Sequence, residues 1–147
     1  MMSISSLLLL GHLIGLALGV GAASVKLMLL LKCRVDPDFT HNYLQVAKPI
    51  TRLIVFGLIV LTLTGIVWLV LGYPFTSQLR TKVFLVVLLW VVGPIIDNVV
   101  EPEFEKHLPG QSKPASTAFI RLRTKYLALE MIATGLFYLI IVLWVLL

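Results

Sequence analysis

Several ionisable residues stand inside long apolar runs of the sequence or at their edges, among them His12, Lys26, Lys82, Asp97 and Glu130. An ionisable group at membrane depth costs free energy, so such a residue is a candidate for function by default. A neutral imidazole or amine can bind a metal or carry a proton, and a buried carboxylate must pair with a cation or take up a proton. The pattern therefore indicates a ligand site or a proton-exchanging site among apolar helices.

His12 lies near the start of the first apolar run, and Lys82 opens the third. At 1.5 Å per helical residue, His12 is about 8 Å inside its helix, and the long stem of Lys82 can reach a similar depth from the same side. We predict that both bind a cofactor and that His12 is the metal ligand. In the simpler interpretations His12 donates one hydrogen bond to a neighbouring helix, and Lys82 extends to the lipid headgroups.

Glu130 is an ionisable residue inside the fourth apolar run, about one and a half helical turns from its start. Lys26, in the first run, falls at a similar depth, and Asp97 lies toward the matching end of the third run. We predict that Lys26 and Glu130 form a buried charge pair, which Asp97 could join. The pair could be structural, or it could relay protons.

Gly11, Gly15 and Gly19 recur every four residues in the first run, and Ala22 and Ala23 continue the series. Residues four apart share one face of a helix. Within lipid, such a face of small residues lets another backbone approach closely. We predict that Gly11, Gly15 and Gly19 form a helix-packing face, used against a neighbouring helix, a second copy or a larger complex.

Four stretches reach the roughly 20 apolar residues needed to span a membrane. They cover approximately residues 7–31, 49–71, 82–100 and 126–147. Short connections favour antiparallel neighbours, so we expect an all-α integral membrane protein with one domain over residues 1–147, an up-down-up-down four-helix bundle. Residues 1–24 end in Gly-Ala-Ala-Ser, a sequence typical of signal-peptide cleavage. However, the first run has no preceding positive charge and continues to Leu31, so we expect a retained helix.

The positions of the prolines predict where these helices begin, bend or end. Pro49 is expected in the first turn of the second helix, where its missing N–H costs nothing. Pro94 should bend the third helix or end it early. Residues 101–117 contain three prolines among charged and small polar residues, so we predict an exposed loop.

Positive charge is concentrated in the first and third connections. The residues concerned are Lys32, Arg34, Lys48, Lys106, Lys113, Arg121, Arg123 and Lys125. The positive-inside rule makes these two connections cytoplasmic and both termini extracytoplasmic, in the plasma (inner) membrane.

The composition excludes several classes of function. The chain is 59% hydrophobic and 13% charged, whereas soluble domains are about a quarter charged. Its net charge of +5 comes from residues at the ends of apolar runs, a pattern of membrane topology and not of nucleic-acid binding. With one cysteine, neither an intrachain disulfide nor a thiolate metal cluster can form. The sequence contains no phosphate-binding loop or dinucleotide fingerprint.

Two short segments carry a resemblance to a known family. Leu-Gly-His-Leu-Ile-Gly at residues 10–15 and Leu-Arg-Thr-Lys-Val-Phe-Leu at residues 79–85 resemble the small four-helix HemJ-type protoporphyrinogen oxidases and the related CopD-like and uncharacterised membrane proteins. In that family the matching histidine and lysine are implicated in binding haem b and in activity. The resemblance therefore implies that His12 and Lys82 bind haem b.

Three hypotheses about function follow. The first is a haem-binding protein with a redox role, in which His12 is one axial ligand and Lys82, water, an open position or His12 of a second chain supplies the other. The second is a non-enzymatic subunit of a homo-oligomer or larger membrane complex, packed through the glycine face. The third is a proton- or ion-conducting bundle that uses Glu130 and Lys26. The sequence leaves open whether the protein is an enzyme.

Overall fold

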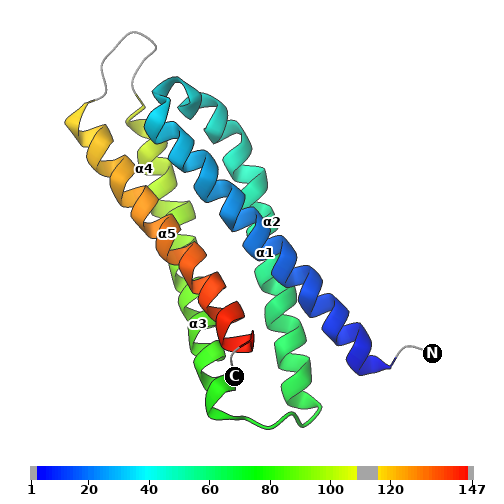
Figure 1. Cartoon of the computed structure of the whole chain (residues 1–147). Coiled ribbons are helices and arrows are strands. Elements are labelled where there is room, and N and C mark those ends of the chain that lie inside the picture. Colours follow the sequence, from blue (N-terminus) through cyan, green and yellow to red (C-terminus); the bar gives the residue numbers. More distant parts are fainter. Residues whose placement is uncertain (1–2, 109–115, 146–147) are drawn as a thin grey trace.

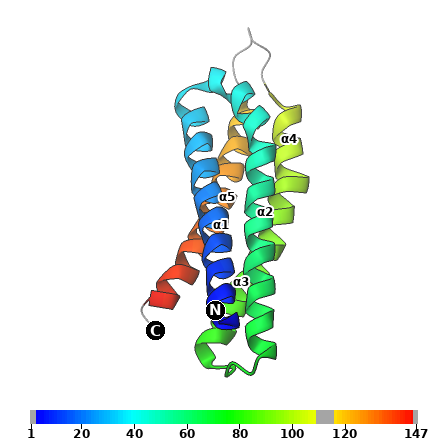
Figure 2. The ribbon, with the colours of Figure 1, turned by 90° about the vertical axis from the view of Figure 1, so that its right-hand side faces the viewer.

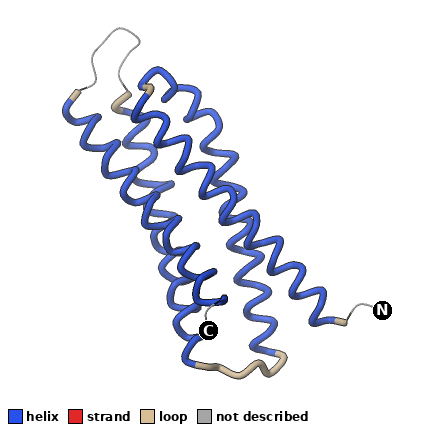
Figure 3. Tube along the Cα trace, viewed as in Figure 1, coloured by secondary structure: helices blue, strands red, loops and turns tan. Residues whose placement is uncertain are grey.

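The fold was examined in a computed structural model that describes residues 3–108 and 116–145. Its elements in chain order are α1 (Ile4–Val35), the 3-10 helix η1 (Pro37–Phe39), α2 (Thr40–Val70), α3 (Ser77–Ile95), the π-helix η2 (Ile96–Val100), α4 (Glu101–Lys106) and α5 (Thr117–Val145). Every regular element in these two ranges is helical (Figure 3). The prediction of an all-α chain is confirmed for this part.

Four rods of the structure are long and apolar enough to cross a membrane. They are Ile4–Val35, Pro37–Val70, Ser77–Lys106 and Thr117–Leu143. Because α3, η2 and α4 follow one another without a break, they form the third rod together (Figure 1). For the described residues, the number of spanning helices predicted from hydropathy is therefore confirmed by length and composition. All four rods begin before the predicted apolar stretches, and the first and third also end after them.

The bundle consists of two helical pairs. α1 packs mainly on α2, while α5 packs on α3 and α4 and also contacts α1. Figures 1 and 2 show the N-terminal end of α1, the C-terminal end of α5 and the turn between α2 and α3 toward one end of the bundle. The η1 turn and α4 lie at the opposite end, which we call the basic end because Lys32, Arg34 and Lys48 lie near it.

Close packing of α1 on α2 depends on three glycines. A Cβ atom added to Gly57 of α2 would lie 2.5 Å from Gly19 N and 2.7 Å from the Gly15 carbonyl oxygen. Gly11, one turn further along, faces the Thr64 methyl group at 3.4 Å from its own ideal Cβ position. The glycine face of α1 is thus occupied within the same chain, by α2 at Gly11 and Gly15 and by both α2 and Phe137 of α5 at Gly19. Residues without a Cβ allow the backbones of α1 and α2 to approach closely.

The region after the third apolar stretch differs from the prediction. Residues 101–106 are not an exposed loop but the helix α4, in which Glu101 and Phe104 are buried. Pro102 stands directly after the π-helix η2, where the hydrogen-bond pattern of the continuous rod changes back from π to α. Phe104 stacks on Phe119 with ring centroids 5.2 Å apart, and this contact holds α4 against α5. Residues 109–115 of the predicted loop lie outside the described residues.

Two other prolines show how packing extends the helices. Pro49 lies well inside α2 and not in its first turn, because α2 already begins at Thr40. Tyr43 and Ala47, which precede Pro49 and lie one turn apart, are both buried. The packed face of α2 therefore extends to the N-terminal side of the proline. As expected for Pro94, the α-helix ends one residue later, and the chain continues as the π-helix η2.

Candidate functional site

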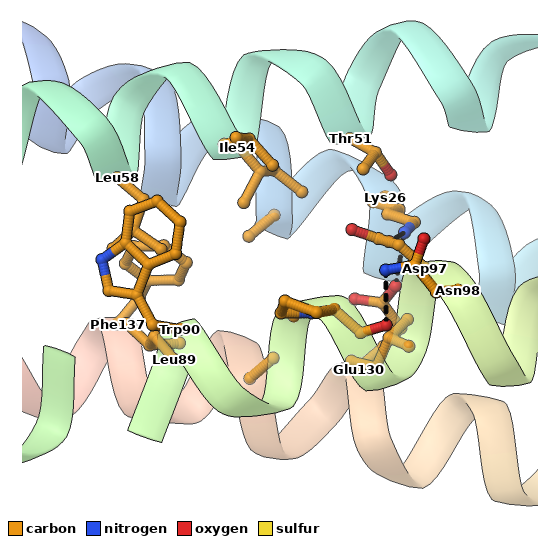
Figure 4. Close-up of a pocket in the computed structure, with 16 residues that line it drawn as sticks. Lys26, Thr51, Ile54, Leu58, Leu89, Trp90, Asp97, Asn98, Glu130 and Phe137 are labelled. Atoms are coloured by element: carbon orange, nitrogen blue, oxygen red, sulfur yellow. Dashed lines mark hydrogen bonds and ion pairs between the residues drawn. The ribbon is translucent and has the colours of Figure 1, made fainter. Parts of the chain in front are cut away.

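Lys26 of α1 is buried and contacts three carboxylates. Its Nζ lies 2.8 Å from Glu130 Oε1 and 3.2 Å from Asp97 Oδ1 (Figure 4). It also lies 3.2 Å from Glu101 Oε2. Lys26 is 1% exposed, and Glu101 and Glu130 are also buried. The residues predicted to pair are thus in direct contact, and Asp97 lies with them. The sequence analysis missed Glu101, which we include with the other three in what we call the Lys26 cluster.

The π-helix η2 positions two of these carboxylates. The N–H of Glu101 donates to the carbonyl of Ile96, five residues earlier, which is the π pattern. Asp97 and Glu101 are four residues apart, so both can face α1. Single π turns inside α-helices occur frequently at functional sites. The four-residue spacing is the signal that could have revealed Glu101, had the third helix been extended beyond Val100.

Two tyrosines extend the Lys26 cluster. The Tyr126 hydroxyl donates to Glu101 Oε2 at 2.8 Å. Because its proton is used there, Tyr126 Oη accepts from the Tyr43 hydroxyl, at a distance of 2.8 Å. Both tyrosines are fully buried. Because Tyr43 belongs to α2 and Tyr126 to α5, the connected polar groups join all four rods of the bundle. The sequence analysis did not identify either residue, since an isolated tyrosine in a helix is ordinary.

The charges of the Lys26 cluster do not balance. When all four groups are ionised, three carboxylates and one ammonium leave two net negative charges, 3 − 1 = 2. Uncompensated charge in a buried site is strongly unfavourable, so such groups hold protons or bind a cation. Only the Asp97 side chain is substantially exposed, at 26%. Protons or cations would therefore reach the Lys26 cluster through Asp97.

A pocket of about 260 Å³ adjoins the Lys26 cluster. Figure 4 shows Lys26, Asp97 and Glu130 at one end of the pocket and Trp90 and Phe137 at the other. The remaining lining residues are Ala23, Thr51, Ile54, Val55, Leu58, Leu89, Gly93, Pro94, Ile96, Asn98 and Ala133. The pocket is thus a mostly apolar space with charged groups at one end.

His12 lies elsewhere, in the α1–α2 contact. Its Nδ1 is 2.7 Å from Thr64 Oγ1, and the Thr64 hydroxyl is 2.8 Å from the Val60 carbonyl oxygen, to which it donates. Nδ1–H must then be the donor to Thr64, which leaves the lone pair of Nε2 free. The ring also packs on Trp68, with centroids 5.1 Å apart.

Lys82 is half-buried near the start of α3. Within residues 3–108 and 116–145, no hydrogen bond or ion pair joins Lys82 to His12, and no group of three histidine, cysteine or acidic residues has an arrangement that could hold a metal ion. His12 lies 14 residues before Lys26 in α1 (26 − 12), and Lys82 lies 15 residues before Asp97 in the rod formed by α3 and η2 (97 − 82). About four helical turns therefore separate each of them from the Lys26 cluster.

Comparison of the chain with protein-family models, with curated proteins and with solved structures gives no match. The resemblance to the HemJ-type family thus rests on residues 10–15 and 79–85 and stays a prediction. The function has to be argued from the geometry of the two sites.

Proposed function

We propose that this chain is a small integral membrane protein that takes up and releases protons at the Lys26 cluster, and so conducts protons or couples them to transport. The observation that supports this proposal is a single buried lysine with three carboxylates within 3.2 Å of its Nζ. A purely structural ion pair needs one carboxylate, whereas the two further acids, one buried and one partly exposed, leave negative charge that a proton or another cation has to balance.

The polar groups form a chain along which a proton can move. Asp97 meets the pocket, Lys26 Nζ is 3.2 Å from both Asp97 and Glu101, and 2.8 Å contacts lead on through Tyr126 to Tyr43. All four distances are within reach of a hydrogen bond. We propose that the proton enters at Asp97 and passes through Lys26 and Glu101 to the tyrosines.

We further propose a location in the plasma (inner) membrane with the basic end in the cytoplasm, following the positive-inside rule. The Lys26 cluster then lies in the cytoplasmic half of the bundle. A homo-oligomer or a larger complex would complete the path to the other side. Since α2 covers the glycine face within the chain, such an assembly would use another surface.

The proposal predicts that Glu101→Gln lowers proton flux at least about tenfold, in line with the contribution of a single proton-transferring group. An amide cannot take up and release a proton between Lys26 and Tyr126. The measurement is proton uptake into proteoliposomes under an imposed potential, followed with a trapped pH-sensitive dye. Glu105→Gln is the matched control, because Glu105 is exposed and 3.9 Å from Lys48 at the surface. Equal flux in wild type and Glu101→Gln would rule out this role.

Haem b binding at His12 is a second proposal, supported by the hydrogen bond between His12 and Thr64. A bond at Nδ1 that fixes the tautomer and orients the ring is typical of histidines that bind a metal through Nε2. When bound, haem would supply redox chemistry or gas binding. In this chain His12 would hold the haem, Thr64 would orient the His12 ring, and Lys82 would be the candidate for a second contact.

If His12 binds haem, the purified protein should show a Soret band that shifts on reduction. His12→Ala should remove the band almost completely while leaving membrane insertion intact, because no other histidine lies inside an apolar run. The measurement is an absorption spectrum in detergent, oxidised and dithionite-reduced, of protein produced with added haem. His41→Ala, which changes an exposed histidine, is the control. A spectrum without visible bands in the wild type would count against haem.

A further inference from the structure

We propose that the pocket beside the Lys26 cluster binds a small organic ammonium ion with an apolar body, in exchange for a proton of the cluster. This inference rests on the proposed proton exchange and names its coupled ligand. Its basis is the position of an acidic, proton-holding group of side chains at one end of an apolar pocket (Figure 4).

The pocket opens between α2 and α3, two helices that make little direct contact. Its rim includes Val55, Pro94 and Trp90, all of which are exposed on the outside of the bundle. Trp90 Nε1 donates to Thr62 Oγ1 at 3.1 Å and so connects α3 to α2 beside the opening. A ligand can therefore enter from the side of the bundle, the face that an apolar molecule dissolved in lipid would meet.

Charge selects the kind of ligand. With all groups ionised, the Lys26 cluster carries two net negative charges, so an entering cation lowers its electrostatic free energy and an entering anion raises it. Asp97, the most exposed of the three acids at 26%, is the carboxylate that a ligand in the pocket would meet first. Charge complementarity therefore favours a cation over a neutral or acidic molecule.

Unused acceptors favour a cation that carries N–H groups. One buried oxygen that lines the pocket, Thr51 Oγ1, makes no hydrogen bond in the described part of the chain, and the carboxylate oxygens of Asp97 and Glu130 beside it have lone pairs to spare. A buried acceptor left without a hydrogen bond is costly. A primary ammonium brings three donors, whereas a quaternary ammonium brings none.

Size and lining define the rest of the ligand. The volume of about 260 Å³ is slightly below the range of about 300–1,000 Å³ for drug-sized ligands, so the occupant is small. Trp90 and Phe137 at the far end offer aromatic faces to an apolar group. Phenethylammonium, with one aromatic ring two carbons from a primary ammonium, combines these features and is the probe we choose.

Binding should release a proton. A cation that enters a site holding excess protons replaces one positive charge with another, so a carboxylic acid of the Lys26 cluster loses its proton to the solvent. No covalent bond to the ligand forms or breaks. The titratable groups that face this site are Lys26 from α1, Tyr43 from α2, Asp97 from η2, Glu101 from α4, and Tyr126 and Glu130 from α5.

The experiment is calorimetric titration of the full chain in detergent with phenethylammonium, in two buffers that differ in ionisation enthalpy. We expect saturable binding with release of about one proton per ammonium, because buried charge must stay balanced. Asp97→Asn should weaken binding at least about tenfold, the effect of one charge-assisted hydrogen bond. Phenethyl alcohol and 3-phenylpropionate, the neutral and acidic counterparts, should bind at least about tenfold more weakly for the same reason. Glu105→Gln is the control variant and should bind like wild type.

Equal binding of the alcohol and the ammonium would overturn the proposal, because it would indicate an apolar pocket filled by lipid chains. Ammonium binding without proton release would overturn the exchange. If Asp97→Asn does not fold, Thr51→Val tests the same end of the pocket and should also weaken binding. If the protein conducts protons normally but does not bind the ammonium, this inference alone is rejected. If Glu101→Gln and wild type conduct protons equally well, the proposed function is rejected.

Discussion

Replacing Lys26 with methionine is expected to destabilise the protein by about 3–5 kcal/mol, the cost of removing one partner from a buried charge pair. Methionine fills a similar volume but leaves Asp97, Glu101 and Glu130 facing one another without a cation. The loss should be smaller in acidic buffer than in alkaline buffer, because protonation neutralises the three acids. This is the larger of the two stability effects that we expect.

The single cysteine offers a direct measurement of this effect. Cys33 is fully buried, so a maleimide should react with it only when the bundle opens. Thermal unfolding of Lys26→Met can therefore be followed by labelling of Cys33 in detergent. Lys48→Met is the control, because the Lys48 side chain is 68% exposed. Equal unfolding temperatures for the two variants would show that the cluster does not depend on its lysine.

Gly57→Ala should loosen the contact between α1 and α2 and lower stability by about 1–3 kcal/mol, the usual cost of overpacking. The added methyl group would meet Gly19 N at 2.5 Å and the Gly15 carbonyl oxygen at 2.7 Å. Both are backbone atoms, which cannot rotate away as a side chain could. The whole of α1 would have to move relative to α2.

Gly65→Ala is the matched control for Gly57→Ala, since both glycines lie inside α2. A Cβ at Gly65 would find no atom within 4 Å among the described residues, so this variant should be neutral or gain up to about 1 kcal/mol from helix propensity. The same Cys33 labelling assay compares the two variants. Similar behaviour of both would mean that the α1–α2 contact is not as close as the structure indicates.

The hypothesis of a membrane subunit packed through the glycine face needs that face to be free, whereas α2 of the same chain covers it. Gly15 and Gly19 face Gly57 of the same chain, which leaves them no free surface for a second copy. The spacing of small residues predicts a close helix contact, but not which helix makes it. That choice follows from Gly57, whose place opposite Gly15 and Gly19 depends on the antiparallel register of α1 and α2.

Hydropathy and charge along the chain were enough to predict four apolar helices and to place Lys26 and Glu130 at a similar depth. Both inferences need only the sequence of one helix at a time: the length of its apolar stretch, and the rise per residue that gives the depth of a side chain. The proline rule was misleading at Pro102, because this residue directly follows the π-helix η2 and the rod continues through it as α4.

Only the tertiary structure decided which polar groups meet. Glu101, Tyr43 and Tyr126 join the Lys26 cluster from three different elements, and Thr64 of α2 holds His12. Such contacts depend on the rotation of each helix about its axis and on the π turn at Ile96–Val100. The sequence by itself determined the helices and the depth of their ionisable groups, because these are one-dimensional properties. The packing of one helix on another determined the site.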